Sequence, residues 1–154
     1  MFVGVMLIAG CGTPYNGTYS GTQMVMLPQQ LTQYGFQNTE SSSVTLTFVA
    51  NGQQVTGSMN APNGVSAQFT GIETGSTLAI SSATINSIRA VSALYPSTTT
   101  LTCQGAVFAG VLTSTNNQLT GTLTSNSGTQ LPAMINGAVS GCPTSIQITA
   151  TRTS

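Results

Sequence analysis

Apolar and polar residues alternate with a period of two through most of this chain. Residues 44–48 place apolar side chains on one face and threonines on the other, and residues 118–124 and 145–151 repeat the pattern. Successive side chains of a β-strand point to opposite sides of its sheet, so this period is typical of strands with one buried face. The alternation therefore predicts an all-β fold.

Turn signals separate these runs at short intervals, among them Asn51-Gly52 and Asn63-Gly64. Asn-Gly is favoured in tight hairpins because both residues tolerate positive φ. The spacing predicts an antiparallel meander of about eight to ten short strands. The expected strands cover residues 16–26, 43–50, 53–60, 66–73, 76–82, 99–104, 106–114, 117–125, 130–139 and 144–152.

A meander of this size leaves two open edges unless it closes, and closure removes edges that would otherwise pair with other chains. We therefore predict one domain over residues 16–154, built as a closed up-and-down β-barrel, with a two-sheet β-sandwich as the alternative. Residues 17–21, followed by strand, Asn-Gly, strand and Thr-Gly-Ser, resemble the opening of small barrels of the lipocalin and avidin families. The resemblance implies the fold class alone.

Two stretches interrupt the alternation. Residues 28–37 begin at a proline and predict a loop or a helical turn. Residues 84–95 place Ile85, Ile88 and Val91 three apart, ahead of Pro96, which predicts one short helix.

The sequence also contains a weak internal repeat. Residues 44–59 align without gaps on residues 108–123, and each copy is an expected hairpin whose second strand carries Thr-Gly-Ser or Thr-Gly-Thr. On the alternation, Gly57 and Gly121 fall at inward positions, where a missing side chain permits a close approach of the backbone.

The first eleven residues form a separate segment. Residues 1–10 are uncharged and mostly apolar, too short to span a bilayer as a helix but compatible with the core of a secretion signal. Ile8-Ala9-Gly10-Cys11 resembles the bacterial lipobox. That resemblance implies removal of residues 1–10, diacylation of the Cys11 sulfur and a flexible tether over residues 11–15. The alternative makes residues 2–9 a buried first strand and Cys11 a core thiol.

With Cys11 set aside, Cys103 and Cys142 remain. An even remainder in an exported protein predicts one disulfide between them. Two buried thiols are the alternative. A redox role is not expected, because no pair of cysteines has the C-x-x-C spacing.

Ionisable side chains are almost absent. Glu40, Glu73, Arg89 and Arg152 are the only charged residues, and the chain has no Lys, Asp or His. General acid–base catalysis draws mainly on His, Asp, Glu and Lys, and metal sites need clustered carboxylates, thiolates or imidazoles. The composition therefore predicts a protein that is not an enzyme and holds no cofactor or metal. Nucleic acid is not an expected partner either, because no basic patch exists to neutralise phosphates.

These observations predict a lipid-anchored protein of the bacterial cell envelope that acts as a non-catalytic binding or structural module. Its expected partners are the membrane, through the lipid on Cys11, and an envelope protein, a glycan or a small apolar ligand. A lipocalin-like carrier of an apolar ligand and a subunit of a surface fibre or coat are the alternatives. The sequence leaves open which face of the outer membrane would carry the protein.

Overall fold

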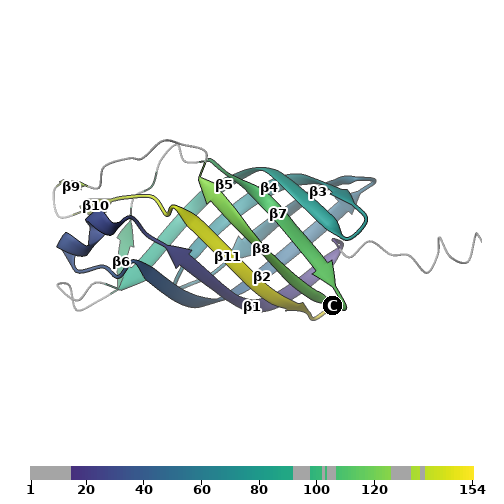
Figure 1. Ribbon diagram of the computed structural model, residues 1–154, viewed down its shortest axis with the longest axis horizontal. Coiled ribbons are helices and arrows are strands. Elements are labelled where there is room, and N and C mark those ends of the chain that lie inside the picture. The colour runs from purple at the N-terminus through teal and green to yellow at the C-terminus, as the bar shows by residue number, and fades with distance from the viewer. Residues whose placement is uncertain (1–14, 92–97, 102, 104–106, 126–132, 136–137) are drawn as a thin grey trace, which may run out of the picture.

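The computed structural model describes residues 15–91, 98–101, 103, 107–125, 133–135 and 138–154 (Figure 1). These residues form one short 3-10 helix and eleven strands. The elements are β1 (Gly17–Met26), η1 (Gln29–Tyr34), β2 (Thr39–Asn51), β3 (Gln54–Asn60), β4 (Val65–Thr74), β5 (Thr77–Val91), β6 (Thr98–Leu101), β7 (Val107–Thr115), β8 (Gln118–Ser125), β9 (Ala133–Ile135), β10 (Ala138–Ser140) and β11 (Ser145–Arg152).

Eight of the strands close into a barrel. The hydrogen-bonded order is β4-β3-β2-β1-β11-β8-β7-β5, and β4 also pairs with β5, which completes the ring. Every neighbouring pair is antiparallel, and β6 extends the sheet beside the second half of β5. The predicted closed up-and-down barrel is therefore confirmed, and the β-sandwich alternative is wrong.

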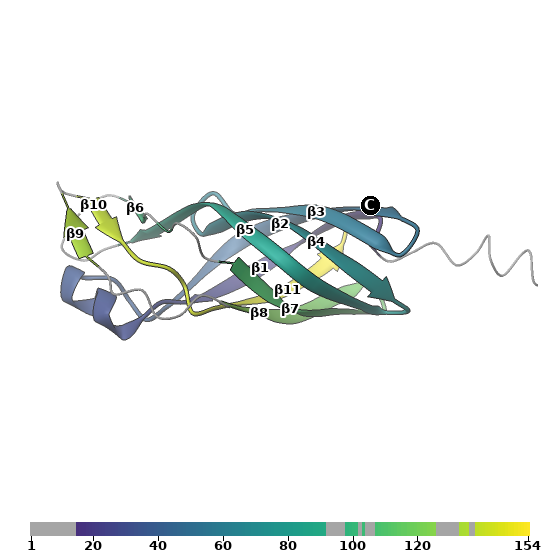
Figure 2. The same ribbon diagram turned by 90° about the horizontal axis from the view of Figure 1, so that it is seen from above.

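The two ends of the barrel differ in construction. The turns β2–β3, β4–β5 and β7–β8, the start of β1 and the end of β11 lie together at one end, which we call the hairpin end (Figure 1). Helix η1 and strands β6, β9 and β10 lie at the opposite end, which we call the distal end (Figure 2). The helical turn predicted within residues 28–37 is confirmed as η1.

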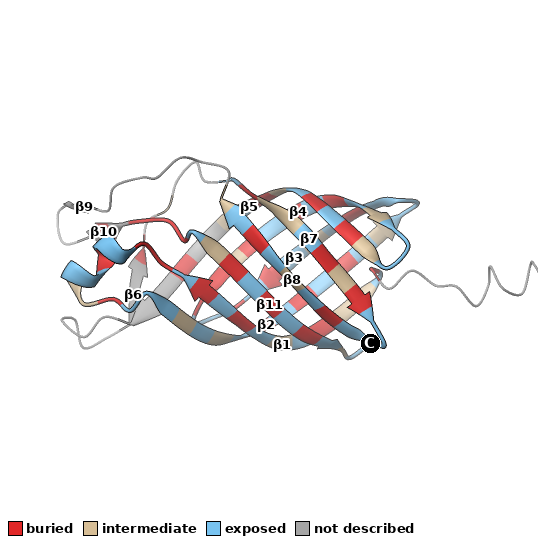
Figure 3. Cartoon of the chain, viewed as in Figure 1, coloured by how far each residue is buried: buried red, intermediate tan, exposed pale blue. Residues whose placement is uncertain are grey.

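Burial alternates along β1 to β4, β7, β8 and β11, and the buried side chains fill the barrel interior (Figure 3). The centre is aromatic: the Phe48 ring lies 5.6 Å from Tyr15, 5.7 Å from Tyr19 and 5.4 Å from Phe69 between ring centroids. Edge-to-face and tilted contacts of this kind add to the stabilisation that comes from burying the rings. The interior is thus a packed core of rings and aliphatic side chains.

The helix predicted over residues 84–95 is wrong where the structure describes the chain, because β5 continues to Val91; residues 92–95 lie outside the described residues. Strand β5 contains two β-bulges, and the one at Asn86 explains the misleading three-residue spacing of Ile85 and Ile88. The pairing of β4 with β5 skips Ser81 and Asn86, so each acts as an extra residue in β5. A bulge moves the next inward position along by one. Ile85 and Ile88 therefore both face the core in an extended strand.

The distal end differs from expectation in one further place. Residues 130–139 do not form a single strand: Ala133–Ile135 and Ala138–Ser140 are two short strands that pair with each other. Asn136 and Gly137, which separate the two strands in sequence, lie outside the described residues.

The internal repeat has a structural counterpart. Gly57 pairs with Phe48 and Gly121 pairs with Leu112, so each hairpin sets an inward glycine opposite a large inward side chain. A Cβ on Gly57 would lie 2.6 Å from Cε1 of Phe69, closer than side-chain packing allows. The predicted close approach at the inward glycines is therefore confirmed.

Cys103 and Cys142 form a disulfide with their Cα atoms 4.9 Å apart. Cys142 is buried, and Cys103 is half-buried against the core. The bond connects the chain just after β6 to the segment that leads into β11. Cys11 and the signal-like segment before it lie outside the described residues.

Candidate functional site

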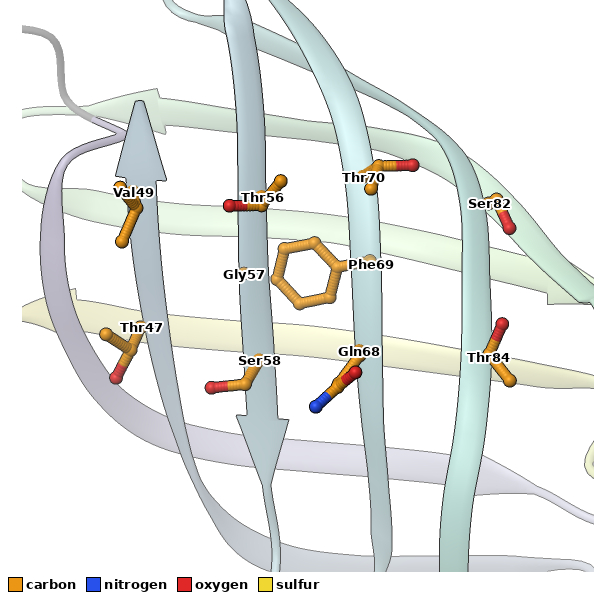
Figure 4. A pocket seen from close by; sticks show the side chains of 10 residues that line it. All are labelled: Thr47, Val49, Thr56, Gly57, Ser58, Gln68, Phe69, Thr70, Ser82 and Thr84. Atoms are coloured by element: carbon orange, nitrogen blue, oxygen red, sulfur yellow. The ribbon is translucent and has the colours of Figure 1, made fainter. Parts of the chain in front are cut away.

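A groove of about 640 Å³ crosses the outer wall of the barrel over strands β2 to β5 (Figure 4). Two rows of outward side chains line it. One row is Thr47, Ser58, Gln68 and Thr84, and the other is Val49, Thr56, Thr70 and Ser82, each residue paired with the next across neighbouring strands. We call these eight residues, with Gly57 and Phe69, the binding groove.

The floor of the binding groove depends on Gly57. Its missing side chain lets the Phe69 ring pack against the backbone of β3 between the two polar rows (Figure 4). The Thr47 carbonyl oxygen would lie 2.8 Å from any Cβ at this position. Glycine thus permits a depression in the wall where any other residue would push the strands apart.

The bulges of β5 border the same groove. Ser81 and Asn86 flank the segment that carries Ser82 and Thr84, the two groove residues on β5. Bulges bend a strand and increase its twist. The wall therefore changes direction along the β5 side of the groove, and the Ser81 hydroxyl donates to the Thr70 carbonyl at 3.4 Å there.

Among the described side chains, none that lines the binding groove is charged. Its hydroxyl groups and the Gln68 amide can each donate and accept hydrogen bonds. Val49, 59% exposed, adds an apolar contact at one side. The surface can therefore hold an uncharged polar ligand by several neutral hydrogen bonds.

The described charged groups lie away from the groove. Glu40 borders a narrow recess of about 10 Å³ near the distal end, too small for a ligand. Glu73 lies near the end of β4, and Arg152 donates to the Asn16 carbonyl at 2.8 Å and lies 5.9 Å from the Tyr19 ring centroid. Arg89 lies on β5, and its side chain is outside the described part of the structure.

Buried polar groups inside the barrel are satisfied within the described residues. The Gln23 amide accepts from the Val65 backbone N–H at 2.7 Å and donates to the Val65 carbonyl at 3.0 Å, as a paired strand would. Tyr15 donates to the Ser76 carbonyl at 2.6 Å. Burial raises the pKa of the Tyr15 phenol well above its ordinary value. These groups hold the fold together rather than offer a reactive site.

Two absences hold for the described part of the chain. No group of three or more His, Cys, Asp or Glu side chains there is placed to hold a metal ion. No helix there has the length and apolar character to cross a membrane.

The structure brings together Cys103 and Cys142, while Cys11 lies in the segment it does not describe. The binding groove was not predicted from the sequence. The Thr-Gly-Ser sequence around Gly57 was a usable signal, because it marked a close approach of the backbone. The alternation also marks Thr47 and Gln68 as outward, but it does not give the strand neighbours that assemble the two rows.

The chain matches no protein-family model, no curated protein and no solved structure.

Proposed function

We propose that this protein is a lipid-anchored, non-catalytic binding module of the bacterial cell envelope, and that its binding groove holds an uncharged glycan chain. The observation that carries the proposal is the charge-free groove of about 640 Å³ with its two rows of hydroxyl and amide groups. A glycan presents many neutral hydroxyl groups, and these match donors and acceptors of the same kind.

The physical argument concerns desolvation. A charged groove would favour charged ligands, and an apolar groove would penalise unpaired sugar hydroxyl groups. When a sugar binds a surface of threonine and serine, hydrogen bonds to water are replaced by similar hydrogen bonds to the sugar. Each such hydrogen bond contributes only a small net free energy of binding. Useful affinity then requires several contacts at once, which two rows across four strands provide.

The geometry supports the two alternative functions, an apolar-ligand carrier and a fibre subunit, less well. A carrier of an apolar ligand needs a large internal cavity, whereas rings and aliphatic side chains pack the interior of the described strands. A fibre subunit needs a long exposed strand edge, whereas closure pairs each of the eight barrel strands on both sides.

The glycan proposal is tested by calorimetric titration with neutral oligosaccharides, namely maltohexaose, cellohexaose and chitohexaose. Thr56→Arg places a charge and a long side chain in the groove, and we expect it to weaken binding at least about tenfold, equivalent to about 1.4 kcal/mol. Thr120→Arg is the matched control, because Thr120 is the repeat counterpart of Thr56 and is exposed on β8 outside the groove.

Equal losses in the two variants would show that the groove is not the site. Absence of binding to every neutral oligosaccharide, together with binding of another ligand class at the same residues, would overturn the glycan assignment.

The anchor is tested separately, by intact mass spectrometry of the protein from its native host. The expected results are cleavage before Cys11 and a mass increase equal to an S-diacylglyceryl group, with or without one further acyl chain on the new amino terminus. An unmodified Cys11 thiol would overturn the anchor.

A further inference from the structure

The hairpin end is the face of this barrel to which an anchored amino terminus would attach. The described chain begins there at Tyr15, and Tyr15 is fully buried. Its phenol donates to the Ser76 carbonyl in the β4–β5 turn at 2.6 Å. A second acceptor, the Leu112 carbonyl, lies 3.1 Å from the phenol oxygen. Its ring packs edge-on against Phe48. The first described residue is therefore fixed to the end of the barrel.

The residues that follow are fixed as well. Arg152 donates to the Asn16 carbonyl at 2.8 Å, and the Thr18 backbone N–H donates to the Ser154 carbonyl at 3.1 Å. Thr153 donates back to the Thr18 carbonyl at 2.8 Å. The residues after Tyr15 thus enter the barrel beside the carboxyl-terminal residues. In the described chain, no flexible spacer lies between Tyr15 and β1.

Backbone hydrogen bonds link the turns of the hairpin end into one face. The Glu73 N–H donates to the Gln53 carbonyl at 2.8 Å, joining β4 to the β2–β3 turn. The Ser114 N–H donates to the Ser76 carbonyl at 2.9 Å, joining β7 to the β4–β5 turn. The Arg152 N–H donates to the Asn117 carbonyl at 2.8 Å, joining β11 to the β7–β8 turn. This face can contact a flat surface as a unit.

The length of the tether limits the distance to the membrane. Cys11 precedes Tyr15 by four residues. A fully extended chain covers about 3.5 Å per residue, so Tyr15 would lie within about 14 Å of an acylated Cys11. This distance is about twice the thickness of one headgroup region, which is about 5–8 Å. An acyl chain on Cys11 would therefore keep the hairpin end against the headgroups.

Exposed apolar side chains lie near both ends of the barrel. Ile72, 49% exposed, lies two residues before the end of β4 at the hairpin end. Met24, Met26 and Val107, which are 39%, 38% and 37% exposed, lie toward the distal end. Glu73 and Arg152 lie at the hairpin end as well, so contact there would be with the hydrated headgroups and not with the hydrocarbon core.

We propose that the hairpin end is the membrane-proximal face and contacts lipid headgroups, while η1, β6, β9, β10 and the Cys103–Cys142 disulfide point away from the bilayer. This orientation rests on the proposed anchor at Cys11. The binding groove lies on the side wall between the two ends and stays open to solvent beside the membrane.

The chain has no tryptophan, so one introduced tryptophan is a unique fluorescent probe. Ile72→Trp reports on the hairpin end, and Met26→Trp is its matched control at the distal end, because both positions are exposed and apolar. The Cys11 thiol of the full chain is coupled to a maleimide lipid in phosphatidylcholine vesicles, while the other two cysteines remain in their disulfide. Some vesicles also contain phosphatidylcholine with a TEMPO spin label on its headgroup, which quenches nearby tryptophan.

The expected result is a loss of Ile72→Trp fluorescence in spin-labelled vesicles and no loss for Met26→Trp. Equal quenching of the two probes, or stronger quenching at Met26→Trp, would overturn the orientation. This outcome is distinct from failure of the anchor, because the maleimide lipid supplies the tether whether or not the cell acylates Cys11. Uncoupled protein mixed with the same vesicles should show no quenching of either probe.

Discussion

At the scale of single residues, Gly57 links the core of the barrel to its outer surface. The residue points inward, pairs with Phe48 on one side and Phe69 on the other, and leaves room for the Phe69 ring against its own backbone. A side chain there would displace a ring of the central aromatic cluster or move the Thr47 carbonyl. The shape of the binding groove therefore depends on a residue that contributes no side chain to it.

We expect Gly57→Ala to lower the free energy of unfolding by about 1–3 kcal/mol, the usual cost of overpacking a filled core. Urea denaturation followed by far-ultraviolet circular dichroism measures the change. Ser58→Ala, one residue along on the exposed face, is the control and should change stability by less than about 0.5 kcal/mol. Combining Gly57→Ala with Phe69→Leu should recover part of the loss, because the two side chains would compete for the same space. Full stability in the single variant would contradict the close packing.

At the scale of elements, a disulfide holds the distal end in addition to the hydrogen bonds of the barrel. The strands β9 and β10 pair with each other in a separate two-stranded sheet and do not join the barrel. The Cys103–Cys142 disulfide spans 39 residues and connects the chain after β6 to the chain before β11. It closes a loop that contains β7 and β8 as well as the two short strands.

Reducing this disulfide, or replacing both cysteines in Cys103→Ser/Cys142→Ser, should lower the free energy of unfolding by about 4 kcal/mol on the chain-entropy model. The urea midpoint with and without a reducing agent measures the change, and Cys11→Ser under oxidising conditions is the control. If the double variant is as stable as the parent, the cross-link does not lower the conformational entropy of the unfolded chain appreciably.

The bulges in β5 show how a local pattern can mislead. Apolar residues three apart predicted a helix, yet Ile85 and Ile88 both face the core of a strand because Asn86 is an extra residue between them. A bulge is set by the pairing of β5 with β4, two strands whose register depends on the whole barrel. The sequence of β5 alone does not contain that information.

At the scale of the whole molecule, the barrel is closed and the chain carries very few charged side chains. Every barrel strand is paired on both sides, and two Arg and two Glu are the only charged side chains of the chain. Stability depends on pH only where groups bind protons differently in the folded and unfolded states. This protein has few such groups, and burial raises the pKa of Tyr15.

We expect the free energy of unfolding to change by less than about 1 kcal/mol between about pH 6 and pH 9, and to fall above about pH 10. A raised folded-state pKa means that the stabilising contribution of the neutral Tyr15 phenol is complete below its unfolded value of about 10. The contribution is lost as pH rises from there toward the folded value. Urea midpoints measured from pH 6 to pH 11 should show this profile.

Tyr15→Phe should be less stable than the parent at pH 7, because the Ser76 carbonyl loses one of its two donors, but its stability should fall less steeply above pH 10. Tyr34→Phe, at a half-buried position in η1, is the control for changes in tyrosine content. An unchanged alkaline slope in Tyr15→Phe would show that other groups cause the loss.

The sequence by itself determined most of the strands and their buried sides, because alternation and turn chemistry are local properties of the chain. The exceptions are the second half of β5 and residues 130–139. The sequence also determined the scarcity of catalytic side chains and the odd cysteine count. The tertiary structure alone decided that β4 meets β5 and β1 meets β11, where β5 is bulged, and that Thr47, Ser58, Gln68 and Thr84 form one row. The physical reason is that a period of two specifies a face, whereas neighbours and register come from non-local packing.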